Sequence, residues 1–252
     1  MKIETGFDAA GLTDVGCQRE NNEDSFAFWE PDTESAAKGK GILAVVADGM
    51  GGYEGGQEAS RIAVATVVEV FKASSEIDQQ SVLLQALRTA HQRIRDEAAA
   101  RPTLYGMGTT CTAVALEGRA LHFAHVGDSR LYLVRDGHIA RLTRDHSYVG
   151  RLVESGLISH DEAEFHPQRH ILTAALGTIG ELVTDSPEAP IPIAGGDVLI
   201  LCSDGLWSQV RDEEMRDILQ RKSPAEACQQ LIQLARQRGG PDNITVQILR
   251  AV

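Results

Sequence analysis

Acidic residues recur at the ends of predicted strands, and this recurrence is the clearest sign of chemistry in the 252-residue sequence. The apolar runs AVVAD, HFAHVGD and VLILCSD each end in an aspartate, and further acids directly precede two other predicted strands. One such acid alone is better explained as a turn residue or a helix cap, because Asp-Gly is a common turn dipeptide. Several carboxylates gathered at one edge would repel one another and would need cations to persist. The acids in question are Glu23, Asp24, Asp48, Asp128, Asp204 and Asp242.

The types of the neighbouring residues indicate which cation and which substrate would suit such a cluster. No histidine or cysteine cluster accompanies the acids in the sequence, so we expect Mg²⁺ or Mn²⁺ rather than zinc. Glycines follow Asp48, and because a glycine lets the backbone approach closely, the carbonyl of Gly49 could face an ion; a flexible turn is the alternative. Arg19 lies five residues before Asp24 and could hold a phosphate by two parallel hydrogen bonds beside the cations.

Short apolar or β-branched segments bounded by glycine or aspartate must position these acids. They predict strands over residues 41–49, 109–118, 119–128, 129–143 and 196–205. The connections between the middle segments are brief, and Asp136-Gly137 is typical of a two-residue hairpin turn. We therefore predict consecutive hairpins in an antiparallel meander.

Two pairs of amphipathic helices are predicted outside these strands. Apolar positions recur every three or four residues over 55–73 and 78–100, and a second pair covers 211–222 and 223–240. The last helix opens with Ser223, Pro224 and Glu226, the pattern of a capping box. Grouped strands and paired helices predict an α+β fold, a four-layer α-β-β-α sandwich in which two antiparallel sheets lie between helix pairs. No linker or repeat interrupts the chain, so we predict one domain over 1–252.

Composition and charge narrow the class of function. The formal net charge is −12, which disfavours a nucleic-acid binder because such proteins use Lys and Arg to neutralise phosphates. No secretory leader or membrane-spanning run is visible, so we expect a cytoplasmic protein without a membrane partner, and a monomer by default. The four cysteines are scattered, which predicts reduced thiols; we expect Cys202 to pack as a small buried hydrophobe rather than to act as a nucleophile.

The order of eight short motifs resembles one known family. The motifs are RENNED (19–24), ADGMGG (47–52), GMGTT (106–110), GDSR (127–130), RDHS (144–147), HPQRHILTAALG (166–177), CSDG (202–205) and GPDNIT (240–245). Each motif is weak alone, but together they span nearly the whole chain. The chain resembles the type 2C (PPM) metal-dependent serine/threonine protein phosphatases, especially their compact bacterial members. The resemblance implies the same sandwich fold, with a mobile flap over about 145–180 beside the metals.

The resemblance also implies a binuclear metal site. Asp48 would bridge two Mn²⁺ or Mg²⁺ ions, the Gly49 carbonyl would bind one of them, and Asp204 and Asp242 would bind the other. Glu23 and Asp24 match positions that bind a metal or hydrogen-bond its waters. Asp128 matches the residue that, with Asp204, would hold a third and weaker ion. Arg19 matches the arginine that would bind the substrate phosphate, and Asn243 matches a supporting residue.

The mechanism that this site implies is hydrolysis of phosphoserine or phosphothreonine in proteins. Paired cations would lower the pKa of a bridging water and orient it toward phosphorus, without a covalent phospho-enzyme. Relatives carry a histidine where this chain has Met50 or Tyr53, so the proton donor for the leaving group stays open between Tyr53 and a metal-bound water, with water preferred. His146, His160, His166 and His170 lie in or near the flap, and we expect them to be exposed or capping residues without a catalytic role.

Two alternatives compete with this interpretation. A catalytically inactive regulatory or binding module of the same fold should lack ligands, yet the full acidic set and Arg19 are present. A nuclease with a carboxylate cluster would need a basic stripe that the sequence lacks. The partners implied are phosphorylated Ser/Thr proteins in bacterial signalling, including a cognate kinase and its substrates.

Overall fold

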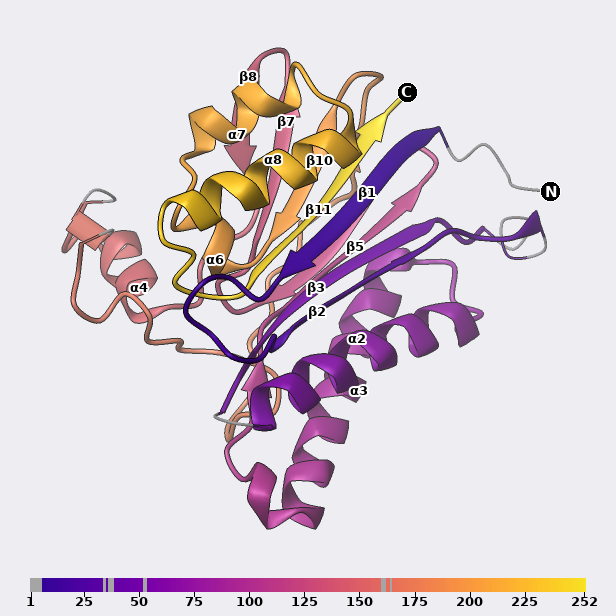
Figure 1. The fold of residues 1–252 in the computed structure, drawn as a ribbon. Coiled ribbons are helices and arrows are strands. Elements are labelled where there is room, and N and C mark those ends of the chain that lie inside the picture. Colours follow the sequence, from indigo (N-terminus) through magenta and orange to yellow (C-terminus); the bar gives the residue numbers. More distant parts are fainter. Residues whose placement is uncertain (1–5, 34, 36–38, 52–53, 160–161, 164) are drawn as a thin grey trace.

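Two antiparallel sheets form the centre of the protein, as described by a computed structural model that covers residues 6–33, 35, 39–51, 54–159, 162–163 and 165–252 (Figure 1). We call the sheet that contains the C-terminal strand sheet I and the other sheet II. In spatial order, sheet I consists of β1 (Phe7–Asp14), β11 (Ile244–Ala251), β10 (Val198–Cys202), β7 (Arg130–Arg135) and β8 (His138–Arg141). Sheet II consists of β2 (Asp24–Trp29), β3 (Ile42–Met50), β5 (Cys111–Glu117), β6 (Ala120–Val126) and β9 (Ile191–Pro192), with the short β4 (Gly108–Thr109) paired to β3.

Helix pairs cover the outer faces of both sheets. The long helices α2 (Gly55–Ala73) and α3 (Gln79–Ala100) lie on sheet II, whereas α7 (Asp212–Leu219) and α8 (Pro224–Gln237) lie on sheet I (Figure 1). Shorter helical segments with described bounds are η1 (Pro102–Leu104), α4 (Tyr148–Glu154) and the single turn α6 (Asp204–Trp207). The predicted four-layer α-β-β-α sandwich is therefore confirmed. No helix in the described part of the chain is long and apolar enough to cross a membrane.

The alternation of side chains along β3 shows how the layers are joined. Leu43, Val45 and Ala47 pack against α2 and α3, while the intervening side chains face sheet I. A third cluster joins sheet I to α7 and α8. Because β3 is buried on both faces, its sequence is a continuous apolar run, and a polar residue first becomes tolerable where the strand leaves the core, at Asp48.

The predicted helix signals and the predicted tight turn are confirmed. Ser223 accepts from the backbone N–H of Glu226, and the Glu226 carboxylate accepts from Ser223 in return, as in a capping box. β7 and β8 form a hairpin through Asp136 and Gly137, both with positive φ (50° and 76°).

The predicted meander is wrong at one connection. β5 and β6 pair in sheet II, and β7 pairs with β8 and β10 in sheet I, so residues 127–129 carry the chain from one sheet to the other. Both β6 and β7 are apolar and buried over most of their length, so their sequences do not distinguish a hairpin from a crossing. The crossing begins at Gly127 (φ 107°), where a Cβ would lie 2.5 Å from the side chain of Thr110.

The segment predicted as a flap, 145–180, contains α4 and is otherwise mostly irregular in its described part. Isolated β-bridges connect Ser147 to Leu172 within the segment, and Leu176 to Thr109 of β4. The beginning of the segment is tied to the crossing between the sheets, because the His146 N–H donates to the carbonyl of Gly127 at 2.7 Å.

Candidate metal centre

The strand pairing brings the predicted acids to one end of the two sheets. Asp24 is the first residue of β2 and is paired in register with Asp48 on β3. Asp204 follows the end of β10, and because β10 and β11 are antiparallel, Asp242 just before β11 lies at the same end. Asp128 lies in the crossing between the sheets, and its carboxylate is within electrostatic range of Asp204. The predicted convergence is thus what the fold produces.

Two threonines of the GMGTT motif hold the backbone of Asp48. The Asp48 N–H donates to Thr110 Oγ1 at 2.9 Å, and the Asp48 carbonyl accepts from the Thr110 N–H and from Thr109 Oγ1, each at 2.8 Å. These contacts use the backbone of Asp48 alone. The Asp48 carboxylate is left to face the other acids, whose charges act on it.

Asp24 is buried and only partly satisfied. Ser203 Oγ donates to Asp24 Oδ2 at 2.7 Å and accepts from the Thr245 N–H at 3.0 Å, whereas Asp24 Oδ1 is buried without a partner. Burial, together with the nearby carboxylates, raises the pKa of Asp24 to about 7. A buried carboxylate oxygen without a donor is unfavourable, and a cation would satisfy it.

The other central acids are under the same electrostatic stress. Burial, followed by the charges of neighbouring carboxylates, raises the pKa values of Asp48 and Asp128 well above their usual range. Burial and the Asp242 charge raise the pKa of Asp204 to about 6, and Asp204 Oδ1 is buried without a hydrogen-bond partner. Divalent cations would offset this excess of negative charge, and an all-oxygen set suits Mg²⁺ or Mn²⁺.

The residues fit such ions in charge and in donor chemistry. In the part of the chain that the structure describes, however, no three His, Cys, Asp or Glu side chains are already arranged to hold one ion together. The fit therefore depends on the unpaired oxygens of Asp24 and Asp204 and on the raised pKa values of the cluster.

The glycines after Asp48 serve a close approach between two backbone segments. A Cβ on Gly49 would lie 2.0 Å from the carbonyl oxygen of Gly56, and a Cβ on Gly56 would lie 2.1 Å from Glu23 Oε2. The Glu23 carboxylate is therefore seated against the first turn of α2, where burial raises its pKa. The close contact between these segments therefore requires glycine at positions 49 and 56, independently of the predicted exposure of the Gly49 carbonyl.

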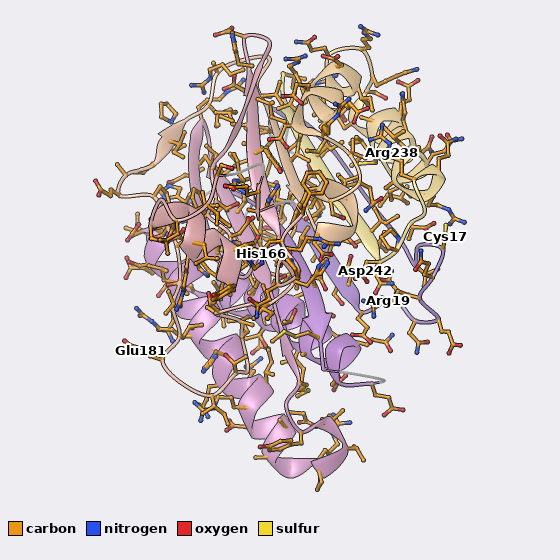
Figure 2. The ribbon with its side chains drawn as sticks, turned by 90° about the vertical axis from the view of Figure 1, so that its left-hand side faces the viewer. Cys17, Arg19, His166, Glu181, Arg238 and Asp242 are labelled. Atoms are coloured by element: carbon orange, nitrogen blue, oxygen red, sulfur yellow. The ribbon has the colours of Figure 1, made fainter. Side chains whose placement is uncertain are left out.

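Arg19 and Asn243 join the first motif to the last. Arg19 donates to Asp242 Oδ2 at 2.8 Å, and Figure 2 shows the two side chains next to each other. Asn243 Oδ1 accepts from the Glu23 N–H at 2.7 Å, and its Nδ2 donates to the carbonyls of Val15 and Asn21. Asn243 thus holds the segment that carries Glu23 and Asp24 against the beginning of β11.

Tyr53 lies outside the described residues, as does His160. Cys202 is buried and unpaired, as expected, and burial raises the pKa of its thiol, which disfavours a nucleophilic role. The expectation that His146 is exposed or capping is wrong: its side chain is 11% exposed and its ring lies 5.0 Å from that of the buried His125.

Sequence reasoning missed Ser203, which contacts Asp24 directly. Its place in the CSDG motif next to Asp204 was the available signal. Trp207 was missed as well: its Nε1 donates to the backbone carbonyl of Asp128 at 2.9 Å.

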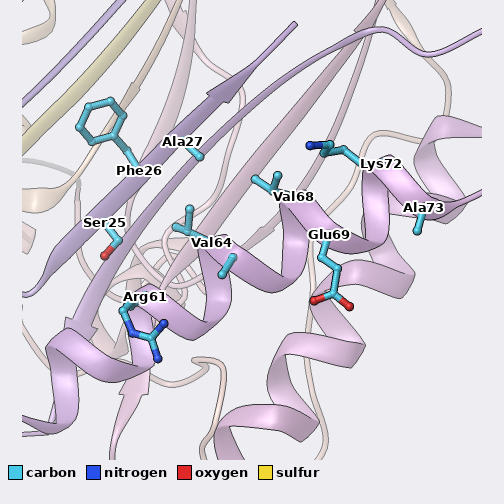
Figure 3. A pocket seen from close by; sticks show the side chains of 10 residues that line it. Ser25, Phe26, Ala27, Arg61, Val64, Val68, Glu69, Lys72 and Ala73 are labelled. Atoms are coloured by element: carbon cyan, nitrogen blue, oxygen red, sulfur yellow. The ribbon is translucent and has the colours of Figure 1, made fainter. Parts of the chain in front are cut away.

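A separate groove of about 800 Å³ lies between β2 and α2 (Figure 3). Apolar side chains such as Phe26, Val64 and Val68 line it, with Arg61 and Lys72 among its polar residues. None of the acids of the cluster lines the groove. Its lining offers shape but no convergent carboxylates, so we place the chemistry at the acidic cluster.

Comparisons with known proteins identify the family. The family model described as "Protein phosphatase 2C" matches residues 18–243. A putative protein phosphatase 2C-type from Streptococcus pyogenes is 38% identical over 243 residues, which cover 94% of each chain. The serine/threonine protein phosphatase PstP of Mycobacterium tuberculosis is also 38% identical, over 96% of this chain; the chain spans 45% of the length of that relative.

Solved structures agree with the fold as well as with the sequence. The serine/threonine phosphatase of S. agalactiae superposes with a TM-score of 0.89 at 34% identity, covering 98% of this chain and 100% of the other. The catalytic domain of PstP, in complex with two manganese ions, gives a TM-score of 0.82 at 35% identity, with 98% of each chain covered. These relatives favour the catalytic interpretation over the inactive module. The predicted fold class and family are confirmed, and the chain belongs to the protein phosphatase 2C family.

Proposed function

We propose that this chain hydrolyses phosphoserine and phosphothreonine in proteins with two Mn²⁺ or Mg²⁺ ions. The proposal is supported by the cluster of Asp24, Asp48, Asp128 and Asp204. Burial and mutual repulsion raise the pKa values of these acids, and buried oxygens of Asp24 and Asp204 lack hydrogen-bond partners. Such a cluster is unfavourable by itself and favourable around cations.

Asp48 would hold both ions, with the Gly49 carbonyl on one side and Asp204 and Asp242 on the other. Glu23 and Asp24 would complete the cluster directly or through waters, and Asp128 with Asp204 would hold a third ion more weakly. When bound, the cations supply Lewis-acid activation of a water nucleophile and offset negative charge on the transferring phosphoryl group.

Arg19 would bind the phosphoryl group of the substrate. Its guanidinium bonds to Asp242 at the border of the cluster, and its side chain is 53% exposed, so its remaining donors can reach an incoming phosphate. The contact with Asp242 restrains the Arg19 side chain beside the acids and lowers the entropic cost of binding. An arginine at this place supports a phosphate ester as substrate.

The leaving alkoxide must gain a proton. The Met50 thioether carries none, and burial keeps the Cys202 thiol protonated within the core. We propose that water rather than Tyr53 supplies the proton, so a Tyr53→Phe variant should keep its activity on both aryl phosphate and phosphopeptide substrates.

We further propose a setting for this activity. The chain would act as a single domain over 1–252, as a monomer in the cytoplasm, with the 145–180 segment as a flap that contacts the substrate protein. It would oppose a bacterial Ser/Thr kinase and act on that kinase or its substrates.

Phosphate release from a phosphothreonine peptide, measured in EDTA, Mg²⁺ or Mn²⁺, tests the proposed function. We expect release only with a divalent cation, and a loss of at least about a hundredfold in Asp48→Asn and in Asp204→Asn. Asp8→Asn, on an exposed position of β1, is the matched control and should retain full activity. Equal release in EDTA, or full activity of both cluster variants, would contradict the proposal.

A further inference from the structure

Trp207 connects two of the acidic residues through the backbone. It is the last residue of α6, the single helical turn that begins at Asp204. Its indole Nε1–H donates to the backbone carbonyl of Asp128 at 2.9 Å. Asp128 lies in the crossing between the sheets, so this bond joins that crossing to the turn that carries Asp204.

A buried ion pair holds the indole in place. The Arg130 guanidinium lies over the Trp207 ring, 3.6 Å from its centroid. Arg130 Nε and Nη2 donate to the two oxygens of Asp145 at 3.0 and 2.6 Å, and its Nη1 donates to the Tyr132 hydroxyl at 3.1 Å. The side chains of Arg130 and Asp145 are 16% and 12% exposed, so the pair is shielded from solvent and fixed in orientation.

The crossing itself is held from its other side by His146. The His146 N–H donates to the carbonyl of Gly127 at 2.7 Å, and the Gly127 N–H donates to His146 Nδ1 at 3.3 Å. With the crossing held there, the bond from Trp207 decides how the carbonyl of Asp128 is oriented with respect to α6.

We propose that Trp207 is a positioning residue which, supported by Arg130 and Asp145, holds Asp128 and Asp204 in register so that together they bind the third, weaker cation. This inference rests on the proposed function, since it assumes that the cluster binds cations. It assigns a role to three residues that need not touch the ion, the substrate or the reacting atoms.

Cation binding to Trp207→Phe, measured by isothermal titration with Mg²⁺, tests the proposal. Phenylalanine keeps the aromatic face under Arg130 but removes the N–H donor. We expect the weaker phase of binding to lose about fivefold in affinity, the value of one ordinary hydrogen bond, while the tighter phase stays within about twofold. Trp29→Phe is the matched control, because Trp29 lies on β2 against Phe71, and both phases should be unchanged in it.

A spectroscopic signal provides a second and independent measurement. The chain has two tryptophans, so in Trp29→Phe the indole emission reports on Trp207 alone. We expect that emission to change during the weaker Mg²⁺ phase, and the change to vanish when Asp128→Asn is added to Trp29→Phe. Because this measurement keeps Trp207, it still tests the proposal if Trp207→Phe fails to fold.

The outcomes separate this inference from the proposed function. Unchanged binding by Trp207→Phe, equal weakening of both phases, or an emission that does not follow the weaker phase would overturn the role of Trp207 and leave the metal site standing. A wild-type chain that binds no Mg²⁺ or Mn²⁺ would overturn both.

Discussion

Replacing Asp24 by asparagine should make the metal-free protein more stable at neutral pH. Asp24 is 7% exposed, and burial raises its pKa to about 7 from an ordinary value of 3.8. Between these two pH values the folded chain keeps a proton on Asp24 that the unfolded chain has lost. The unfolded state therefore binds fewer protons, and the free energy of unfolding falls as pH rises.

The size of this effect follows from the pKa of Asp24. The slope is about 1.4 kcal/mol per pH unit below about pH 7, so the wild type should lose about 2 to 3 kcal/mol between about pH 5 and pH 8 through this one group. The asparagine of the variant carries no charge at any of these pH values. The stability of Asp24→Asn minus that of the wild type should therefore rise by the same amount.

Urea unfolding followed by circular dichroism in EDTA, from about pH 5 to pH 8, measures this difference. Burial lowers the pKa of His125 to about 4, so this group makes the free energy of unfolding rise with pH between about pH 4 and pH 6.5. His125 is present in both proteins, and its contribution cancels in the difference. Saturating Mg²⁺ should remove the advantage of Asp24→Asn. A difference that is flat or falls with pH in EDTA would refute the reasoning.

Three further substitutions test single contacts. Arg19→Ala should lower kcat/KM on a phosphothreonine peptide by about a hundredfold. Arg19→Lys should recover only part of this loss, because an ammonium cannot bind a phosphate by two parallel bonds, and a loss under about threefold in Arg19→Ala would exclude Arg19 from phosphate binding. Gly56→Ala places a Cβ 2.1 Å from Glu23 Oε2 and should weaken Mn²⁺ binding about tenfold in isothermal titration, while Gly55→Ala should have little effect. Equal Mn²⁺ affinities of Gly56→Ala and the wild type would show that the Glu23 carboxylate is not needed at that place. Cys202→Ala should keep its activity within about twofold and should lower the free energy of unfolding in urea by about 1 to 2 kcal/mol. A loss of activity without a loss of stability would indicate that the Cys202 thiol takes part in the reaction.

The sequence predicted the layers and the convergence of the acids because both depend on local patterns. A strand that is apolar until an aspartate must leave the core at that residue. Antiparallel pairing then places the end of one strand beside the beginning of its neighbour, as with Asp48 of β3 and Asp24 of β2. The capping box at Ser223 is likewise local, and it appears at its predicted place.

The features that were missed depend on contacts between distant segments. The chain crosses between sheets at Gly127, and the buried strands on either side follow no alternation that would mark the change. His146 packs against His125, and the indole of Trp207 reaches Asp128, across 21 and 79 residues of sequence. Spacing along the chain does not predict pairs of this kind, because the sheet crossing that creates them was itself not predicted.

The most direct test of the account measures bound Mn²⁺ and phosphate release in the same titration of metal-stripped protein. We predict that hydrolysis of a phosphothreonine peptide begins only as about two ions bind per chain, and that Asp48→Asn neither binds the pair nor releases phosphate. Hydrolysis at full rate with no ion bound, or two ions bound tightly by Asp48→Asn, would contradict the claim that the carboxylates at the ends of these strands form the catalytic centre.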